Sequence, residues 1–208
     1  MKARKMFLIT IGITLALCLA VSAHAGLAVD FTSIGMDHWD GSYYSLGWSF
    51  KVGSDNIDVD ALGFYDDQKN GLTQSHDVGI YDAQGNLLAS TTVTPNAVLS
   101  SWWRWSSLTS PLVLAAGQTY YIAAVNGSEN YTWNPFGFVT APGINFVQDQ
   151  YIVSSTLAFP SYSYNGSNGR AWFGPNFNTS TAVPLPASLL LMGPGLAGLA
   201  VLRKKFNR

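Results

Sequence analysis

Charged residues are scarce in this 208-residue chain: Asp, Glu, Lys and Arg make up 11% of it, against 48% hydrophobic residues. Soluble domains are about one-quarter charged. Cysteine is nearly absent as well, because Cys18 is the only one, which excludes a disulfide framework and a multi-cysteine metal site. The net charge of −1 argues against a nucleic-acid-binding protein. The length is that of one domain with short accessory segments.

The few charges are unevenly placed along the chain. All twelve acidic residues lie within residues 26–182, together with four of the eleven basic residues. The remaining basic residues lie in the two tails. The sequence therefore describes an acidic body between two basic ends.

The N-terminal end has the features of a secretory signal peptide. Three basic residues (Lys2, Arg4 and Lys5) precede an apolar run over residues 7–21. Ala23 and Ala25 then supply small residues at the −3 and −1 positions of a cut after Ala25. We expect residues 1–25 to form a signal helix that is removed on export; the alternative is a buried N-terminal helix.

The C-terminal end contains an apolar segment of a different kind. Residues 185–202 carry no charge and are followed directly by Arg203, Lys204 and Lys205. A helix of that length spans about 27 Å, enough to cross a hydrocarbon core. Because basic residues stay on the cytoplasmic side, the segment predicts a transmembrane helix in the inner membrane with the body in the periplasm. The alternative to a processed segment is a plain single-span anchor.

The last 26 residues resemble the PEP-CTERM sorting signal. The resemblance rests on three parts in a fixed order: a short motif, an apolar segment and a terminal basic cluster. The motif consists of Val183, Pro184, Leu185, Pro186, Ala187 and Ser188. Leu185 stands where the usual motif has Glu, which matches the Val-Pro-Leu-Pro-Ala variant of the signal. The resemblance implies a Gram-negative bacterium, an exosortase as processing partner, and transfer to the cell surface or release. It also implies association with exopolysaccharide and biofilm.

The body alternates between apolar and polar residues with the period of β-strands. In residues 42–51, Tyr44, Leu46, Trp48 and Phe50 share one face. In residues 56–65 the apolar phase changes midway, which predicts a β-bulge near Asp60 and Ala61. Further strands are expected at residues 77–81, 86–93, 102–108, 112–114, 118–125, 143–147, 151–157 and 171–173.

Strands of this length and spacing predict an all-β fold, an antiparallel β-sandwich of jelly-roll-like form. We expect the sandwich to cover residues 26–158, followed by a loop-rich last strand and linker over residues 159–182. Residues 78–90, 103–111 and 116–121 also resemble an uncharacterised bacterial β-sandwich domain of extracellular surface proteins. That resemblance covers residues 46–126 and implies a fold without implying an activity.

Catalytic motifs are lacking. The chain has three histidines, a single glutamate (Glu129) and no Gly-x-Ser-x-Gly elbow. We therefore expect a protein that is not an enzyme. Asp66 and Asp67, which fall at a predicted turn, are the candidates for a structural calcium site, because calcium takes carboxylate and carbonyl oxygens; the alternative is that they are ordinary turn formers.

Aromatic side chains are the remaining candidates for ligand binding. Trp102 and Trp103 fall on opposite faces of one predicted strand, and Trp105 shares the face of Trp103, so at least one indole is expected near solvent. Exposed rings stack well on sugars. Four more candidates lie elsewhere in the body: Trp39, Tyr43, Tyr162 and Tyr164. The alternative for each ring is packing in the core.

These features predict an exported surface or matrix protein that binds exopolysaccharide without catalysis. One alternative is a structural matrix component that has protein partners only. Another is a carbohydrate-active hydrolase that uses Asp66 or Asp67.

Overall fold

The computed structural model describes residues 26–34, 36–38, 43–133, 137–164 and 171–180, and all regular elements in these ranges are β-strands. The pairings between them are antiparallel. The strands are β1 (Gly26–Leu27), β2 (Val29–Asp30), β3 (Met36–His38), β4 (Tyr44–Val52), β5 (Ile57–Tyr65), β6 (His76–Asp82), β7 (Leu87–Val93), β8 (Val98–Ser100), β9 (Trp103–Leu114), β10 (Thr119–Val125), β11 (Tyr131–Trp133), β12 (Val139–Thr140), β13 (Ile144–Val153), β14 (Tyr162–Ser163) and β15 (Pro175–Ser180).

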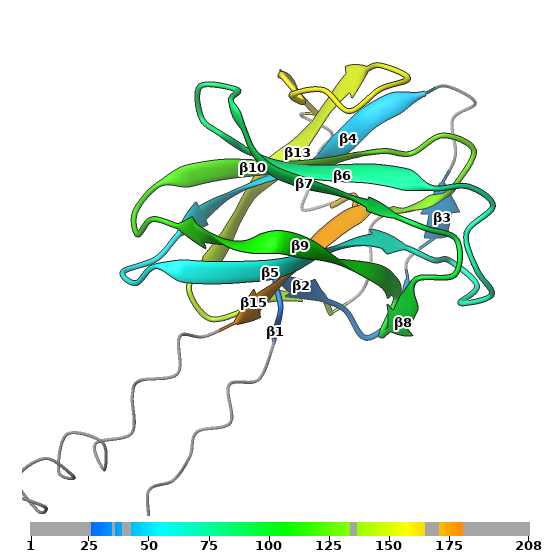
Figure 1. Cartoon of the computed structure of the whole chain (residues 1–208), viewed down its shortest axis with the longest axis horizontal. Coiled ribbons are helices and arrows are strands. Elements are labelled where there is room, and N and C mark those ends of the chain that lie inside the picture. Colours follow the sequence, from blue (N-terminus) through cyan, green and yellow to red (C-terminus); the bar gives the residue numbers. More distant parts are fainter. Residues whose placement is uncertain (1–25, 35, 39–42, 134–136, 165–170, 181–208) are drawn as a thin grey trace, which may run out of the picture. The chain divides into compact units, whose positions relative to one another are not determined.

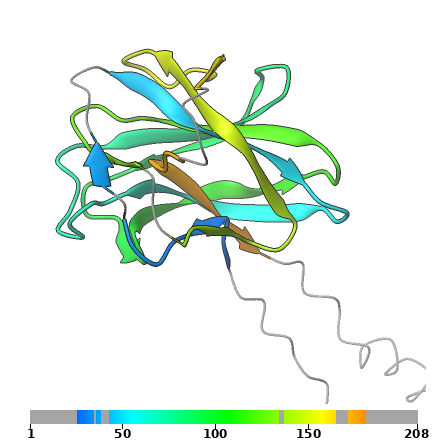
Figure 2. The same ribbon diagram turned by 180° about the vertical axis from the view of Figure 1, so that it is seen from behind.

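Two sheets face each other as the layers of a sandwich (Figure 1). One has the strand order β1-β15-β5-β9-β8, and the other has the order β14-β13-β4-β10-β6-β7. Two short ribbons, β11-β3 and β12-β2, add to the periphery. Seen from behind, β13 crosses the six-stranded layer near one edge, between β14 and β4, and β15 runs through the other layer (Figure 2). The predicted all-β antiparallel class is confirmed.

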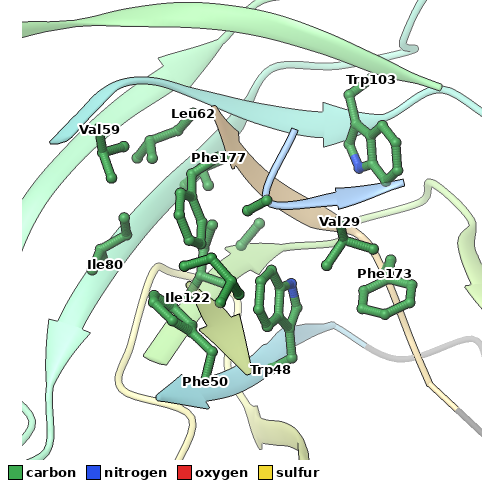
Figure 3. Close-up of a cluster of buried hydrophobic side chains, with 14 of the residues drawn as sticks. Val29, Trp48, Phe50, Val59, Leu62, Ile80, Trp103, Ile122, Phe173 and Phe177 are labelled. Carbon is green, nitrogen blue, oxygen red and sulfur yellow. The ribbon is translucent and has the colours of Figure 1, made fainter. Parts of the chain in front are cut away.

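The core fills the space between the sheets. Trp48 and Phe50 of β4 are fully buried, and the ring of Phe177 in β15 lies 4.8 Å from that of Phe50. Figure 3 shows these side chains converging with Ile122 from β10 and Val59 from β5. The Nε1–H of Trp48 donates to the carbonyl of Pro175 at 3.0 Å, so this large core side chain has its polar atom satisfied.

The bulge predicted near Asp60 and Ala61 is confirmed. The pairing of β5 with β9 shifts between Val59 and Ala61, and the pairing of β5 with β15 shifts at the same place, between Leu62 and Val59. The extra residue lets both halves of β5 direct apolar side chains to one core although their sequence phases differ.

Other expected boundaries were wrong. The sequence suggested gaps between strands at residues 109–111 and 148–150. In the structure, β9 and β13 are continuous through these residues. β13 has a register shift between Phe146 and Gln148, which mimics a break in the alternation. Residues 171–173 are not a strand either.

The last strand of the sandwich lies in the loop-rich segment after residue 158. β15 pairs with β5 on one side and with β1 on the other, so the last strand is an interior strand of its sheet. Ahead of it, Ala158 exchanges two hydrogen bonds with the Ser45 hydroxyl, and the Phe159 ring packs on Tyr121 at 4.9 Å. The segment after β13 therefore covers the outer face of the six-stranded sheet.

The predicted signal helix over residues 1–25, the sorting motif at 183–188, the transmembrane helix over 185–202 and the basic cluster all lie outside the described residues. Among the residues that the structure describes, none belongs to a helix with the length and apolar character needed to cross a membrane.

A candidate ligand site: an aromatic pocket

One end of the sandwich holds a pocket of about 230 Å³ with an almost wholly aromatic lining. This volume lies above the roughly 150 Å³ of a protein cavity that accepts benzene and below the roughly 300 Å³ at which pockets for drug-sized ligands begin. The pocket therefore has the size of one ring. It is lined by Tyr44, Leu46, Tyr131, Trp133, Tyr151, Tyr164 and Trp172.

The floor of the pocket continues the core face of β4. Tyr44 and Leu46 follow the same alternation as Trp48, and Tyr151 of β13 lies directly opposite Leu46. The rings of Tyr44 and Tyr151 are in edge contact, with 5.8 Å between their centroids. Register and alternation thus place these side chains on one face of the sheet.

The opposite wall comes from β11 and from the segment that leads into β15. Thr132 of β11 donates its N–H to the carbonyl of Phe173 and accepts the Phe173 N–H on its hydroxyl at 3.0 Å. This pairing sets Tyr131 and Trp133 beside Trp172. The wall is therefore assembled from segments about forty residues apart in the sequence.

The rings of the wall contact one another. Tyr164 lies 4.5 Å from Trp172, Trp133 lies 5.4 Å from Trp172, and Trp133 lies 5.9 Å from Tyr164, so each ring of this trio contacts the other two. Tyr162, which is 60% exposed, packs on Tyr151 at 5.9 Å and extends the aromatic surface outward.

Two buried polar groups at the pocket wall lack a full set of hydrogen-bonding or charged partners among the described residues. The Nε1–H of Trp172 is buried and has no acceptor among the described residues. Asp149 of β13 is 3% exposed, and its Oδ1 accepts the backbone N–H of Trp172 at 2.8 Å. Burial raises the pKa of Asp149 to about 7, against the lowering effect of that hydrogen bond.

The tryptophans singled out in the sequence lie elsewhere, on the five-stranded sheet. Trp103 is fully buried in the core, so the expectation that it contacts a ligand at the surface was wrong. Trp102 stacks on Phe31 at 5.6 Å and carries the Lys69 ammonium 3.7 Å above its ring. The Trp105 indole covers Gly63 so closely that a Cβ there would meet it at 2.9 Å.

The other aromatic candidates have different positions. Tyr164 lines the pocket, and Tyr162 borders it through Tyr151. Tyr43 directly precedes the pocket residue Tyr44 and is 51% exposed. Trp39 lies outside the described residues.

Asp66 and Asp67 are held as parts of a turn. Asp66 is buried, and its carboxylate accepts the Arg104 Nε–H at 2.7 Å together with the N–H groups of Asn70 and Gly71. A calcium ion would have to displace Arg104 from it. Asp67 accepts the Asn130 side-chain N–H at 2.9 Å. Within the described ranges, no three His, Cys, Asp or Glu side chains come together in a way that could hold a metal ion.

Sequence reasoning missed most of the pocket lining, including Trp133 and Trp172, and it missed the carboxylate of Asp149 behind the wall. The alternation of β4 did place Tyr44 and Leu46 on the face of Trp48, but nothing local shows that the second sheet leaves this end of the face uncovered. Trp172 falls in a segment that was expected to be a strand.

A comparison with curated proteins finds no match. A family model does match residues 32–169, about two-thirds of the chain and a span that includes the pocket except for Trp172. The span also contains residues 46–126, for which the sequence suggested an uncharacterised bacterial domain. The chain therefore belongs to the family described as "Domain of unknown function (DUF4082)".

Proposed function

We propose that this protein is exported, acts at the cell surface or in the extracellular matrix, and binds polysaccharide through the aromatic pocket without catalysis. The observation that carries the proposal is a ring-sized pocket walled by contacting Tyr and Trp side chains. Tyr and Trp combine an apolar ring with a polar handle, which suits ligands that have apolar faces and hydroxyl edges. A sugar ring is such a ligand.

The polar atoms at the wall fit the same class of ligand. The unpartnered Nε1–H of Trp172 is a donor for a ligand oxygen, provided that the wall relaxes enough to admit it. Tyr162 provides an exposed ring next to the pocket, on which a neighbouring sugar unit would stack. One sugar would therefore occupy the pocket while its chain continues over the surface.

Binding is favoured over hydrolysis by the composition of the lining. Glycoside hydrolysis uses two carboxyl groups on either side of the bond that is cleaved. The lining residues supply hydroxyls, indoles and one leucine, and no carboxylate. Asp66, the proposed hydrolase residue, is bound by Arg104.

Export is supported by the sequence of the two ends. The features of a signal peptide at residues 1–25 and of a PEP-CTERM signal at residues 183–208 favour passage through the inner membrane and processing by an exosortase. Intact-mass measurement of the protein from its own cells tests this. An extracellular species from Gly26 to near Pro186 is expected, whereas a membrane-bound species that still ends at Arg208 would contradict the sorting.

The binding proposal is tested with the full chain in mild detergent and a panel of polysaccharides. Trp133→Ala and Tyr164→Ala are expected to weaken binding about tenfold or more, because each removes a stacking ring. Tyr43→Ala is the control, since it removes an exposed ring that does not line the pocket. Absence of binding to every glycan, with reversible self-association instead, would favour the structural matrix alternative.

A further inference from the structure

The wall of the aromatic pocket has the character of a cation site. The described residues that line it are uncharged, and the trio of Trp133, Tyr164 and Trp172 offers π faces at close mutual distances. The face of an aromatic ring carries negative potential, and rings grouped around one space are the usual way in which proteins hold alkylammonium groups.

A carboxylate stands directly behind this wall. Oδ1 of Asp149 accepts the Trp172 N–H at 2.8 Å, and the backbone carbonyl of Asp149 accepts the Tyr164 N–H at 3.1 Å. Asp149 also precedes Tyr151 by two residues on the same face of β13, since each lies opposite an inward-facing residue of β4. Asp149 therefore forms hydrogen bonds with two pocket-lining residues, Trp172 and Tyr164, and shares a strand face with a third, Tyr151.

This carboxylate lacks a counter-ion among the residues that the structure describes. The ion pair that the described residues do form joins Arg104 to Asp66, at the turn after β5. The two buried carboxylates thus differ: Asp66 has a cation at 2.7 Å, whereas burial leaves Asp149 with a pKa raised to about 7. A positive charge in the pocket would favour the ionised form of Asp149 and would be attracted to it. A neutral ligand would have no such charge interaction.

From these contacts we infer that the pocket selects a sugar ring that carries a protonated amine, such as a hexosamine unit without its acetyl group, over the neutral ring. The ammonium group lies among the ring faces, and Asp149 supplies the opposite charge from behind Trp172. The inference rests on the proposed polysaccharide-binding function and names the chemical class of the sugar.

The test compares two probes that differ only at nitrogen, a glucosamine tetrasaccharide and its N-acetylated counterpart. Both are titrated at pH 7 into the full chain in detergent by calorimetry. Asp149→Asn removes the charge and keeps the acceptor for the Trp172 N–H. Asp77→Asn is the matched control, because it removes a carboxylate from the exposed surface of β6 in the same sheet.

We expect the glucosamine probe to bind about tenfold more tightly than the acetylated probe. Asp149→Asn should abolish most of this preference and change the affinity for the acetylated probe by less than about twofold, while Asp77→Asn keeps the preference. Equal binding of both probes, or a preference that survives in Asp149→Asn, would overturn the inference and leave the polysaccharide proposal standing. No binding of either probe or of any glycan in the panel would overturn both.

Discussion

Two pairs of side chains lie on the same face of β4 and differ in what covers them. Trp48 and Phe50 pack against Phe177 of β15 and are fully buried, whereas Tyr44 is half-buried and, with Leu46, lines the pocket opposite β11 and the segment around Trp172. Four residues along one strand separate a filled core from an open pocket. The apolar face is the same, so the extent of the opposing sheet decides whether aromatic rings stabilise the fold or remain available to a ligand.

The chemistry of the two groups differs as well. The core is built mainly from Phe, Val, Ile and Leu, with two indoles, of which Trp48 has its N–H satisfied and Trp103 does not. The pocket uses mainly Tyr and Trp, which bring hydroxyl and N–H groups to an apolar surface. This difference supports the assignment of stability to the first group and of recognition to the second.

The largest expected effect is the loss of stability when an aromatic ring is removed from the core. Phe177→Ala removes a fully buried ring that packs on Trp48 and Phe50. Such a cavity costs about 3–5 kcal/mol of unfolding free energy. Urea denaturation measures it, and a loss below about 1 kcal/mol would mean that the core is not packed as described.

A gain in stability is expected from Asp149→Asn. The pKa of Asp149 is raised in the folded state, so its contribution is fully present below the unfolded pKa of about 4 and is lost as pH rises through about 7. The variant should be about 4 kcal/mol more stable than the wild type at pH 8 and nearly equal to it at pH 4.

Thermal and urea unfolding at the two pH values measure that difference. The contrasting variant is Asp66→Asn, which breaks the buried pair with Arg104 and should lower stability. If Asp149→Asn were destabilising at pH 8, the carboxylate would have a counter-ion that the described residues do not contain.

A smaller cost in stability is expected at the pocket end. Trp133 is half-buried, and Trp133→Ala should lower the unfolding free energy by about 1–2 kcal/mol while weakening glycan binding about tenfold. Parallel denaturation and binding titrations separate the two readouts. A cost equal to that of Phe177→Ala would remove the distinction between core and pocket.

The smallest expected effect is a loss of stability at acid pH that is caused by His76. His76 stacks on Phe64 at 3.9 Å, and its buried Nε2 has no partner among the described residues. Burial lowers the pKa of His76, so the unfolded chain binds the proton more readily and stability falls as pH drops below about 6.5. The dependence on Asp149 has the opposite sign.

Unfolding of the Asp149→Asn variant between pH 5 and 7.5 isolates the contribution of His76. His76→Phe in the same background should make the stability nearly independent of pH over this range. If the dependence persisted unchanged, another group would be responsible for it.

The sequence predicted features that depend on neighbouring residues better than features that depend on contacts between distant segments. Alternation in β4 and the phase change at Asp60 are local, and both were read correctly. Alternation does not show which of Trp102, Trp103 and Trp105 is covered, because that depends on what packs over β9; Trp103 is fully buried and the other two are half-buried. The pocket joins β4, β11, β13 and the residues around Trp172, so only the packing of distant segments reveals it.

The most direct test of the central claim uses the tryptophans of one molecule as reporters. Indole N–H resonances of the ¹⁵N-labelled chain are followed while the glucosamine tetrasaccharide is added. The account predicts shifts for Trp133 and Trp172 at the pocket, with Trp48 and Trp103 in the core unchanged. Shifts confined to Trp102 and Trp105 on the other sheet, or no shift in any indole, would contradict it.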